Sequence, residues 1–174
     1  MSSAVESGPI RVCFVCTGNI CRSPIAERVL VRMLDEAGLS DEVAVDSVGT
    51  GGWHVGQPMD ARAAASLRAA GYDAGRHMAR QVDRELLAGR DLVVALDRSH
   101  VATLSRMAPG IASSGKLVLL RSFSEEPEGN LDVDDPYYGD ESGFDDVVAV
   151  VERSCRSLVK HLDSMVKRRR GPAR

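Results

Sequence analysis

The chain has 174 residues, of which 44% are hydrophobic, and a formal net charge of −3 at neutral pH. This length is typical of a single domain with a sizeable core, and no apolar run reaches the roughly 18 residues that a membrane-spanning helix needs. Five of the basic residues lie within the last eight positions, so the rest of the chain has 17 basic and 25 acidic residues. Such an acidic body argues against nucleic-acid binding as the main task.

The two ends of the chain differ in composition from the body. The first nine residues have neither a basic start nor an apolar segment, so residues 1–9 are predicted to be a flexible leader and not a secretion signal. Residues 10–166 are expected to form one domain, and residues 167–174 a flexible basic tail. Three of the four cysteines lie within residues 13–21, unlike the spread cysteines of secreted disulfide-bonded domains. We therefore predict a cytoplasmic protein, unless another route exports it.

Short β-branched apolar runs alternate with segments of helical periodicity, which is the pattern of a parallel sheet covered by helices on both faces. Four strands in such a series fit an α/β, flavodoxin-like fold with strand order 2-1-3-4, in which ligands bind at the carboxyl end of the first strand. The expected strands are residues 10–16, 43–48, 91–96 and 116–120. The expected helices are residues 24–37, 60–70, 83–88, a helix that Asp97 or Ser99 caps and that ends before Pro109, and, after a long loop over 122–143, residues 144–166.

The loop after the first strand, residues 16–23, has the sequence Cys-Thr-Gly-Asn-Ile-Cys-Arg-Ser. Ser23 is predicted to be the N-cap of the following helix, with Pro24 at its first position and Glu27 near the positive end of its dipole. The backbone N–H groups at such a helix start attract anions. We therefore expect an oxyanion site at this junction.

The residue types in this loop suit attack on a bound phosphate. Cys16 would lie at the focus of the positive field, which favours the nucleophilic thiolate, and Arg22 can grip two oxygens of one anion. Gly18 and Asn19 tolerate the left-handed backbone that lets successive N–H groups surround one centre. The loop lacks the Gly-Lys-Ser/Thr end of a Walker nucleotide loop. The pattern therefore favours cysteine-based phosphate chemistry over nucleotide binding and over a tight turn with an inert cysteine.

Two motifs near opposite ends of the chain carry a family resemblance. Residues 15–24 read Val-Cys-Thr-Gly-Asn-Ile-Cys-Arg-Ser-Pro, and residues 135–138 read Asp-Pro-Tyr-Tyr. Both resemble motifs of the low-molecular-weight protein tyrosine phosphatase family, and the resemblance covers residues 9–166. It implies the flavodoxin-like fold and the hydrolysis of phosphotyrosine.

The resemblance assigns the reaction to three residues. Cys16 would attack phosphorus and form a phosphocysteine while Arg22 holds the equatorial oxygens, and Asp135 would protonate the leaving phenolate and later activate water. The spacing alone does not separate Asp135 from Asp134, and an acidic loop with a proline is also typical of a solvated connection. Because Arg22 and the helix start supply positive charge, the resemblance implies no cofactor and no metal, and the four histidines form no ligand-spaced cluster.

Further residues are assigned to substrate binding and support by the same resemblance. Asn19 would hold the loop in shape through side-chain hydrogen bonds to Ser23, Ser47 and His77, and Ser23 would also donate to Cys16. Each partner has a plainer alternative, as a helix cap, a strand end or a structural histidine. The residues expected to bind the substrate are Thr17, Gly18, Asn19, Ile20, Cys21, Trp53, Tyr137 and Tyr138.

Aromatic side chains are expected to set the substrate preference. If Trp53, Tyr137 and Tyr138 form walls around a deep phosphate site, phosphotyrosine reaches its floor and the shorter phosphoserine does not. Core packing or plain surface exposure is the alternative for the two tyrosines. Tyrosine-phosphorylated proteins are therefore the expected partners, with inorganic phosphate as product and inhibitor, and weak self-association is left open.

The remaining cysteines lead to a redox hypothesis and to a competing activity. An oxidant would join Cys21 to Cys16 in a reversible disulfide that protects Cys16, unless Cys21 only shapes the loop. Cys13 and Cys155 are expected in the core. Arsenate reduction on the same scaffold would need more cysteines to relay a disulfide outward, and Cys155 is the only later one. A non-catalytic phosphotyrosine-binding module is opposed by the intact catalytic residues.

Overall fold

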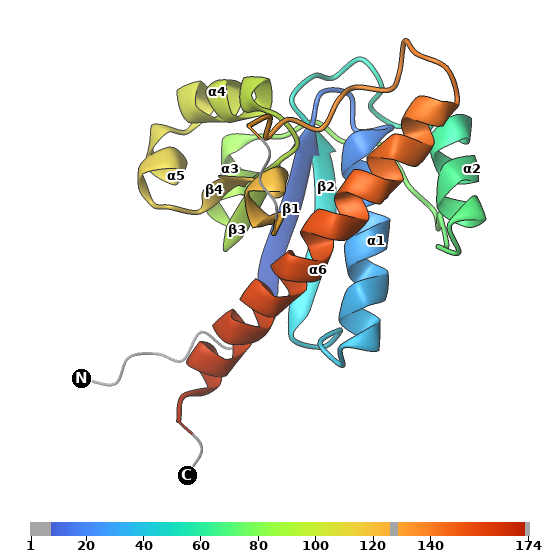
Figure 1. Cartoon of the computed structure of the whole chain (residues 1–174). Helices are drawn as coiled ribbons and strands as arrows, with labels where there is room; N and C mark the ends of the chain where they lie inside the picture. Colours follow the sequence, from blue (N-terminus) through green and yellow to red (C-terminus); the bar gives the residue numbers. More distant parts are fainter. Residues whose placement is uncertain (1–7, 126–128, 173–174) are drawn as a thin grey trace.

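The computed structural model describes residues 8–125 and 129–172 of the chain. They form a four-stranded parallel sheet in the order β2-β1-β3-β4, with helices on both faces (Figure 1). The strands are β1 (Ile10–Cys16), β2 (Val43–Gly49), β3 (Leu92–Ala95) and β4 (Leu117–Leu119). The predicted flavodoxin-like fold is confirmed, whereas residues 1–7 of the expected leader and residues 173–174 of the expected tail lie outside the described residues.

β1 is the strand that positions the functional loop. It pairs with β2 on one side and with β3 on the other, so the strand order reverses at its carboxyl end. Val12 and Phe14 are buried in one core cluster, and Cys13 and Val15 in the cluster on the opposite face. Because both faces of β1 are covered, the loop that begins at Cys16 emerges from a rigid part of the core.

Helices form a layer on each face of the sheet. One layer contains α1 (Arg22–Glu36), α2 (Ala61–Ala69) and α6 (Ser142–Arg170), and the other contains α3 (Arg84–Ala88), α4 (Arg98–Met107) and α5 (Pro109–Ser113). A 3-10 helix, η1 (Leu120–Phe123), follows β4 and packs against α6. The sequence analysis missed α5 and η1, because single turns are too short to show a helical period.

The start of α1 differs from the prediction. The helix begins at Arg22, two residues before Pro24, so the prediction that Ser23 caps it is wrong. The N-cap position is Cys21, which makes no side-chain cap hydrogen bond. Ser23 lies inside the first turn, where its hydroxyl contacts the sulfur of Cys16. No side chain therefore occupies the N-terminal cap of α1, which leaves this end open toward an anion.

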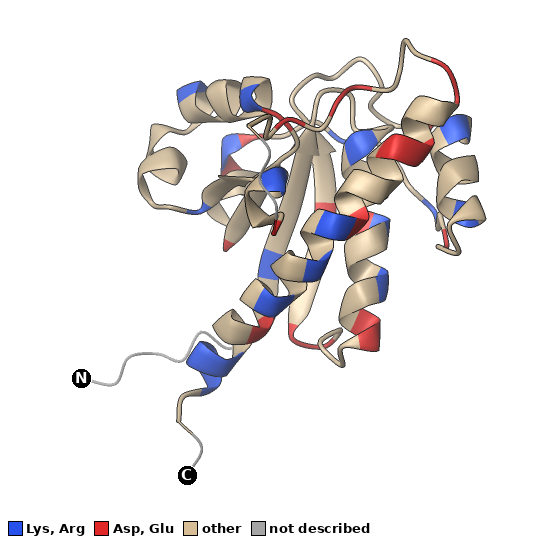
Figure 2. Cartoon of the chain, viewed as in Figure 1, with Lys and Arg blue, Asp and Glu red and all other residues tan. Residues whose placement is uncertain are grey.

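α6 is longer than the predicted helix over 144–166 and ends at Arg170. Residues 167–170, expected in a flexible tail, form its last turn, where positive side chains interact favourably with the negative end of the helix dipole. Arg169 also pairs with Asp91 at 2.6 Å. Figures 1 and 2 show this basic end of α6 projecting below the sheet.

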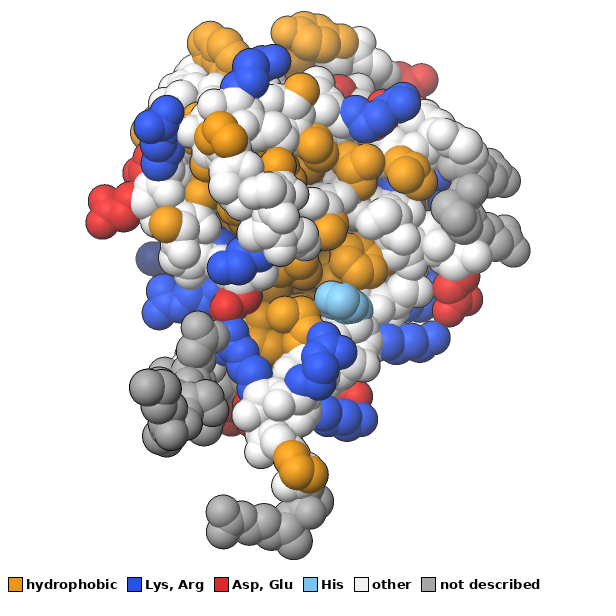
Figure 3. Space-filling view, turned by 90° about the vertical axis from the view of Figure 1, so that its left-hand side faces the viewer, with side chains coloured by type: hydrophobic (Ala, Val, Ile, Leu, Met, Phe, Trp, Pro, Cys, Tyr) orange, Lys and Arg blue, Asp and Glu red, His pale blue; other side chains and the backbone are white. Residues whose placement is uncertain are grey.

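Charges of both signs are spread over the surface. Figure 3 shows lysine and arginine side chains around a hollow in which hydrophobic side chains reach the surface, with acidic side chains among them. Within the described part of the chain, no helix combines the length and the apolar character that crossing a membrane requires.

Candidate active site

A cavity of about 350 Å³ opens at the carboxyl end of β1. Its walls come from the β1–α1 loop, the loop after β2 and the segment that precedes α6. This is the position at which open α/β folds bind their ligands. The residues that line it are Cys16, Thr17, Gly18, Ile20, Cys21, Arg22, Trp53, His54, Asp135, Tyr137 and Tyr138.

A chain of hydrogen bonds connects the sulfur of Cys16 to the carboxylate of Glu27. This side chain is 2% exposed, and its Sγ lies 2.9 Å from the hydroxyl of Ser23. The amide nitrogen of Asn19 donates to Ser23 at 2.8 Å and to Ser47 at 3.0 Å, and Ser47 donates to the carboxylate of Glu27 at 2.6 Å. The Ser23 hydroxyl, which accepts from Asn19, lies within donor distance of both the Cys16 sulfur and the backbone carbonyl of Val48, at 3.4 Å. Glu27 therefore accepts the hydrogen bond at the end of this chain. It does not lie in the first turn of α1, near which the sequence analysis had placed it.

Asn19 shapes the loop, and its side chain is not among those that line the cavity. Its φ of 57° is left-handed, and its Oδ1 accepts from the backbone N–H of Arg80 at 2.9 Å. His77 contacts the backbone carbonyl of Asn19 at 2.6 Å, and not the side chain as predicted. Gly18 has no left-handed φ; a Cβ atom there would lie 2.8 Å from the ring of His54, so that ring would have to shift.

Arg22 is buried and held from three directions. Its Nη1 donates to Asp97 at 2.7 Å and to the backbone carbonyl of Val133 at 2.9 Å. Its Nη2 donates to the hydroxyl of Thr17 at 3.3 Å and lies 3.5 Å from the carboxylate of Asp135. A guanidinium with so many partners is held in one orientation at the cavity wall.

Asp135 is the carboxylate that reaches this cavity. Its Oδ1 accepts a hydrogen bond from the backbone N–H of Tyr137 at 3.1 Å, and its Oδ2 faces Arg22. Asp134, which the sequence spacing left open as an alternative, does not line the cavity. The geometry therefore separates the two neighbouring carboxylates.

Aromatic rings stand around the mouth of the cavity. Trp53 and Tyr138 are 74% and 91% exposed, and Tyr137 meets Tyr138 edge to face at a centroid distance of 4.9 Å. The ring of His54 lies 6.1 Å from that of Tyr137. The structure thus brings the three predicted aromatic residues to one opening and adds His54, which the sequence analysis did not place at the site.

Two residues at the start of α4 belong to the site although the sequence analysis did not place them there. Asp97, one of the two residues predicted as the cap of this helix, is the N-cap of α4 and also pairs with Arg22. Burial alone would raise the pKa of Asp97, but hydrogen bonds from Ser99 and Arg22 outweigh it and lower the pKa below its usual range. The cap of α4 could be predicted from the residues around Asp97. Its ion pair with Arg22 could not, because Arg22 is far away in the sequence.

His100 is the second of these residues. Its Nε2 lies 2.8 Å from the hydroxyl of Thr17, and its Nδ1 accepts from the backbone N–H of Asp97 at 3.1 Å. Burial and then the charge of Arg22 lower the pKa of His100 to about 4, so the ring is neutral at cellular pH. The sequence around His100 matches no motif, so its place in the site could not be predicted from the sequence.

Of the three cysteines other than Cys16, only Cys21 lines the cavity. Cys13 and Cys155 are buried in the two core clusters, as predicted. Burial raises the pKa of Cys21 well above its ordinary value, so this residue is a thiol. In residues 8–125 and 129–172, no three His, Cys, Asp or Glu side chains are grouped in a way that could hold a metal ion.

A buried cysteine beside the open start of a helix, with an arginine and a carboxylate at the same cavity, suits an enzyme that acts on phosphate esters. Comparison with known proteins identifies the class further. The family model for low molecular weight phosphotyrosine protein phosphatase matches residues 11–168. The chain therefore belongs to this family and is a protein tyrosine phosphatase, an enzyme that hydrolyses phosphotyrosine.

Relatives across bacteria and eukaryotes support this membership. Low molecular weight protein-tyrosine phosphatase A of Mycobacterium bovis is 47% identical over 168 residues, which covers 96% of this chain and 99% of that protein. The human low molecular weight phosphotyrosine protein phosphatase is 36% identical, covering 89% and 97% of the two chains. The crystal structure of a protein tyrosine phosphatase from Entamoeba histolytica superposes with a TM-score of 0.84 at 31% identity, covering 90% of this chain and 98% of that one.

Proposed function

We propose that this enzyme hydrolyses phosphotyrosine in two displacement steps through a phosphocysteine on Cys16. In the first step the Cys16 thiolate forms a bond to phosphorus, the bond to the phenolate oxygen breaks, and the proton of Asp135 passes to that oxygen. In the second step a water molecule gives a proton to Asp135 and attacks phosphorus, and the bond to sulfur breaks. Inorganic phosphate leaves, and it would inhibit by occupying the same cavity.

The convergence of Cys16, Arg22 and Asp135 on one cavity carries this proposal. Once Cys16 is a thiolate, the Ser23 hydroxyl at 2.9 Å can only donate to its sulfur, which stabilises negative charge on it both before attack and as it leaves. Arg22 and the open start of α1 would hold the oxygens of the transferred phosphoryl group. This positive field supports a reaction that needs no metal.

The substrate is proposed to be a tyrosine-phosphorylated protein that inserts its phosphotyrosine ring between aromatic side chains. Trp53, Tyr137 and Tyr138 line the cavity mouth, where they can contact both faces of such a ring. A reducing compartment such as the cytoplasm is the proposed location, which is supported by the crowding of three of the four cysteines into residues 13–21, unlike the spread cysteines of secreted disulfide-bonded domains.

Reversible oxidation is proposed as a means of regulation. Peroxide would oxidise the Cys16 thiolate to a sulfenic acid and be reduced to water, after which the Cys21 thiol would displace a second water and form the disulfide. Both residues line the same cavity, and Cys21 is buried as a thiol. The disulfide would block attack on phosphorus until a cellular thiol reduces it.

The phosphocysteine can be tested with para-nitrophenyl phosphate in rapid-mixing experiments. We expect a burst of one equivalent of nitrophenol, because formation of the intermediate precedes its hydrolysis. Cys16→Ser should show neither the burst nor acid-stable labelling by radioactive phosphate. Cys13→Ser, which changes a buried cysteine of the same strand, is the matched control and should retain both. Turnover by Cys16→Ser at the wild-type rate would disprove the proposal.

A further inference from the structure

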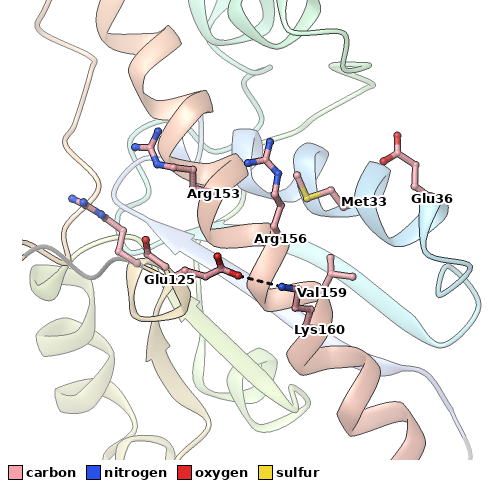
Figure 4. A pocket seen from close by; sticks show the side chains of 9 residues that line it. Met33, Glu36, Glu125, Arg153, Arg156, Val159 and Lys160 are labelled. Atoms are coloured by element: carbon pink, nitrogen blue, oxygen red, sulfur yellow. Dashed lines mark hydrogen bonds and ion pairs between the residues drawn. The ribbon is translucent and has the colours of Figure 1, made fainter.

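A second and larger cavity, of about 960 Å³, lies between α1, η1 and α6 (Figure 4). None of its lining residues lines the cavity at Cys16. Met33 and Val159 are partly buried and pack against the core, so they form an apolar floor. We call this cavity the α6 groove and define it by Met33, Arg121, Arg153, Arg156, Val159 and Lys160.

Four cations and two carboxylates, those of Glu36 and Glu125, line the α6 groove. Arg153, Arg156 and Lys160 follow one face of α6 at intervals of three and four residues (Figure 4). Arg121 lines the groove from η1. Arg153 and Arg156 are exposed and make no hydrogen bond or ion pair with other residues of the described ranges. Lys160 pairs with Glu125 at 3.2 Å, but both side chains are 75% exposed, so this pair is weak. In a chain with a net charge of −3, this is a local concentration of positive charge.

The shape of the α6 groove distinguishes between anionic ligands. No aromatic side chain lines it, so the base of a nucleotide would find no ring to stack on. A flat membrane surface does not reach the floor of a hollow between two helices. An extended peptide alternates its side chains, so it can direct acidic groups at the arginines and apolar groups at Met33 and Val159.

We propose that the α6 groove is a docking site for an extended acidic segment of a partner protein. Carboxylates of that segment pair with Arg153 and Arg156, and its apolar side chains contact Met33. The site is separate from the phosphotyrosine cavity, so a docked partner leaves Cys16 accessible. The proposal goes beyond the catalytic mechanism and does not depend on it.

Arg121 is unsuitable as a test position because it also supports the catalytic loop. Its Nη1 donates to the backbone carbonyl of Asp132 at 3.0 Å, and the next carbonyl, that of Val133, accepts from Arg22. A substitution of Arg121 would therefore disturb both sites. The two arginines on α6 have no such second role and are the residues to change.

The probe is a fluorescent peptide of alternating glutamate and leucine without tyrosine, whose binding to the full-length enzyme is measured by fluorescence anisotropy. Saturating inorganic phosphate occupies the Cys16 cavity. We expect the double variant Arg153→Glu/Arg156→Glu to bind at least ~10-fold more weakly, because two attractions become repulsions. The control Arg84→Glu/Arg106→Glu makes the same change of net charge on exposed residues of α3 and α4, and it should bind like the wild type.

Other outcomes would overturn the proposal. Equal weakening in both double variants would show a general charge effect, and failure of the wild type to bind the peptide would remove the site. Binding to phosphatidylserine vesicles without binding of the peptide would assign the groove to a membrane. Turnover of para-nitrophenyl phosphate and circular dichroism should show that both variants are folded and active. If the glutamate variant does not fold, Arg153→Gln/Arg156→Gln replaces it, again with weaker binding expected.

Discussion

The imidazole of His100 lies 2.8 Å from the hydroxyl of Thr17 and joins the start of α4 to the loop that holds Cys16. Because Nδ1 accepts from the backbone N–H of Asp97, the ring hydrogen is on Nε2 and points at Thr17. The Thr17 oxygen also accepts from Arg22, so its own hydrogen is left for a group in the cavity that it lines. We therefore expect neutral His100 to orient Thr17 as a donor toward bound phosphate.

The substitution His100→Asn should reduce the pH dependence of stability. Burial and the charge of Arg22 lower the pKa of His100 from 6.5 to about 4. Between these pH values His100 is protonated in the unfolded chain but not in the folded one. The free energy of unfolding therefore has its full value with respect to His100 above pH 6.5 and falls as the pH drops toward 4. This loss is about 3 kcal/mol. When urea denaturation is measured at both pH values, the drop in the free energy of unfolding should be smaller in the variant than in the wild type by about that amount.

The control for this experiment is His161→Asn, which removes an exposed histidine from α6. Its free energy of unfolding should vary with pH as in the wild type. If His100→Asn also retained the wild-type pH dependence, the buried neutral ring inferred here would be wrong.

The substitution Asp97→Asn should lower kcat/KM for an aryl phosphate about 100-fold, because small misplacements of a catalytic group are costly and Arg22 loses its charged anchor. Asp132→Asn is the matched control. It also neutralises a paired aspartate, but its partner Arg98 is an exposed residue of α4, at 3.2 Å. We expect the control to change kcat/KM by less than about 3-fold. Equal effects of the two substitutions would argue against a positioning role of Asp97.

Substitutions of Asn19 can separate its backbone from its side chain. Both Asn19→Gly and Asn19→Ala remove the hydrogen bonds to Ser23 and Ser47, and only glycine adopts a φ of 57° without strain. The alanine variant should therefore have a free energy of unfolding about 1 kcal/mol lower than that of the glycine variant. Identical denaturation midpoints would show that the left-handed conformation is not under strain.

The substitution Trp53→Ala tests the aromatic wall. Because Trp53 stands at the cavity mouth, 74% exposed, it would contact the substrate ring but not the phosphorus. We expect KM for a phosphotyrosine peptide to rise about 10-fold with kcat changed less than about 2-fold, the pattern of lost uniform binding. Val55→Ala removes another exposed apolar side chain of the same loop that does not line the cavity, and it should leave both constants unchanged. A drop in kcat without a change in KM would place Trp53 in the chemical step.

Much of the fold could be predicted because its determinants are local. The apolar runs of β1 to β4 and the caps at Asp60, Asp83 and Asp97 are visible in short windows of sequence, and the observed elements follow them. The start of α1 was misjudged because Ser23 satisfies the usual preference for a cap. Its hydroxyl instead bonds to Cys16 and Asn19, and this tertiary arrangement has no signature in the residues around it.

The catalytic site was predictable only in part, for a related reason. The residues of the loop over 16–23 occur together in the sequence, so their chemistry can be interpreted before their geometry is known. Asp97 and His100 reach the same site from a different strand end, and only the parallel order β1-β3 brings them there. Spacing alone did not separate Asp134 from Asp135; the family resemblance favoured Asp135, and Asp135 is the one of the two that lines the cavity.

The substitution Cys21→Ser tests reversible oxidation. After brief treatment with peroxide, the wild type should recover its activity when a thiol reagent is added, because the disulfide with Cys21 prevents further oxidation of Cys16. In the variant, sulfenic acid at Cys16 has no neighbouring thiol, so oxidation continues to forms that thiols do not reverse. Cys13→Ser, which removes a buried cysteine of β1 outside the cavity, should recover like the wild type. Full recovery of the Cys21→Ser variant would contradict a protective disulfide, since Cys16 would then survive without a partner.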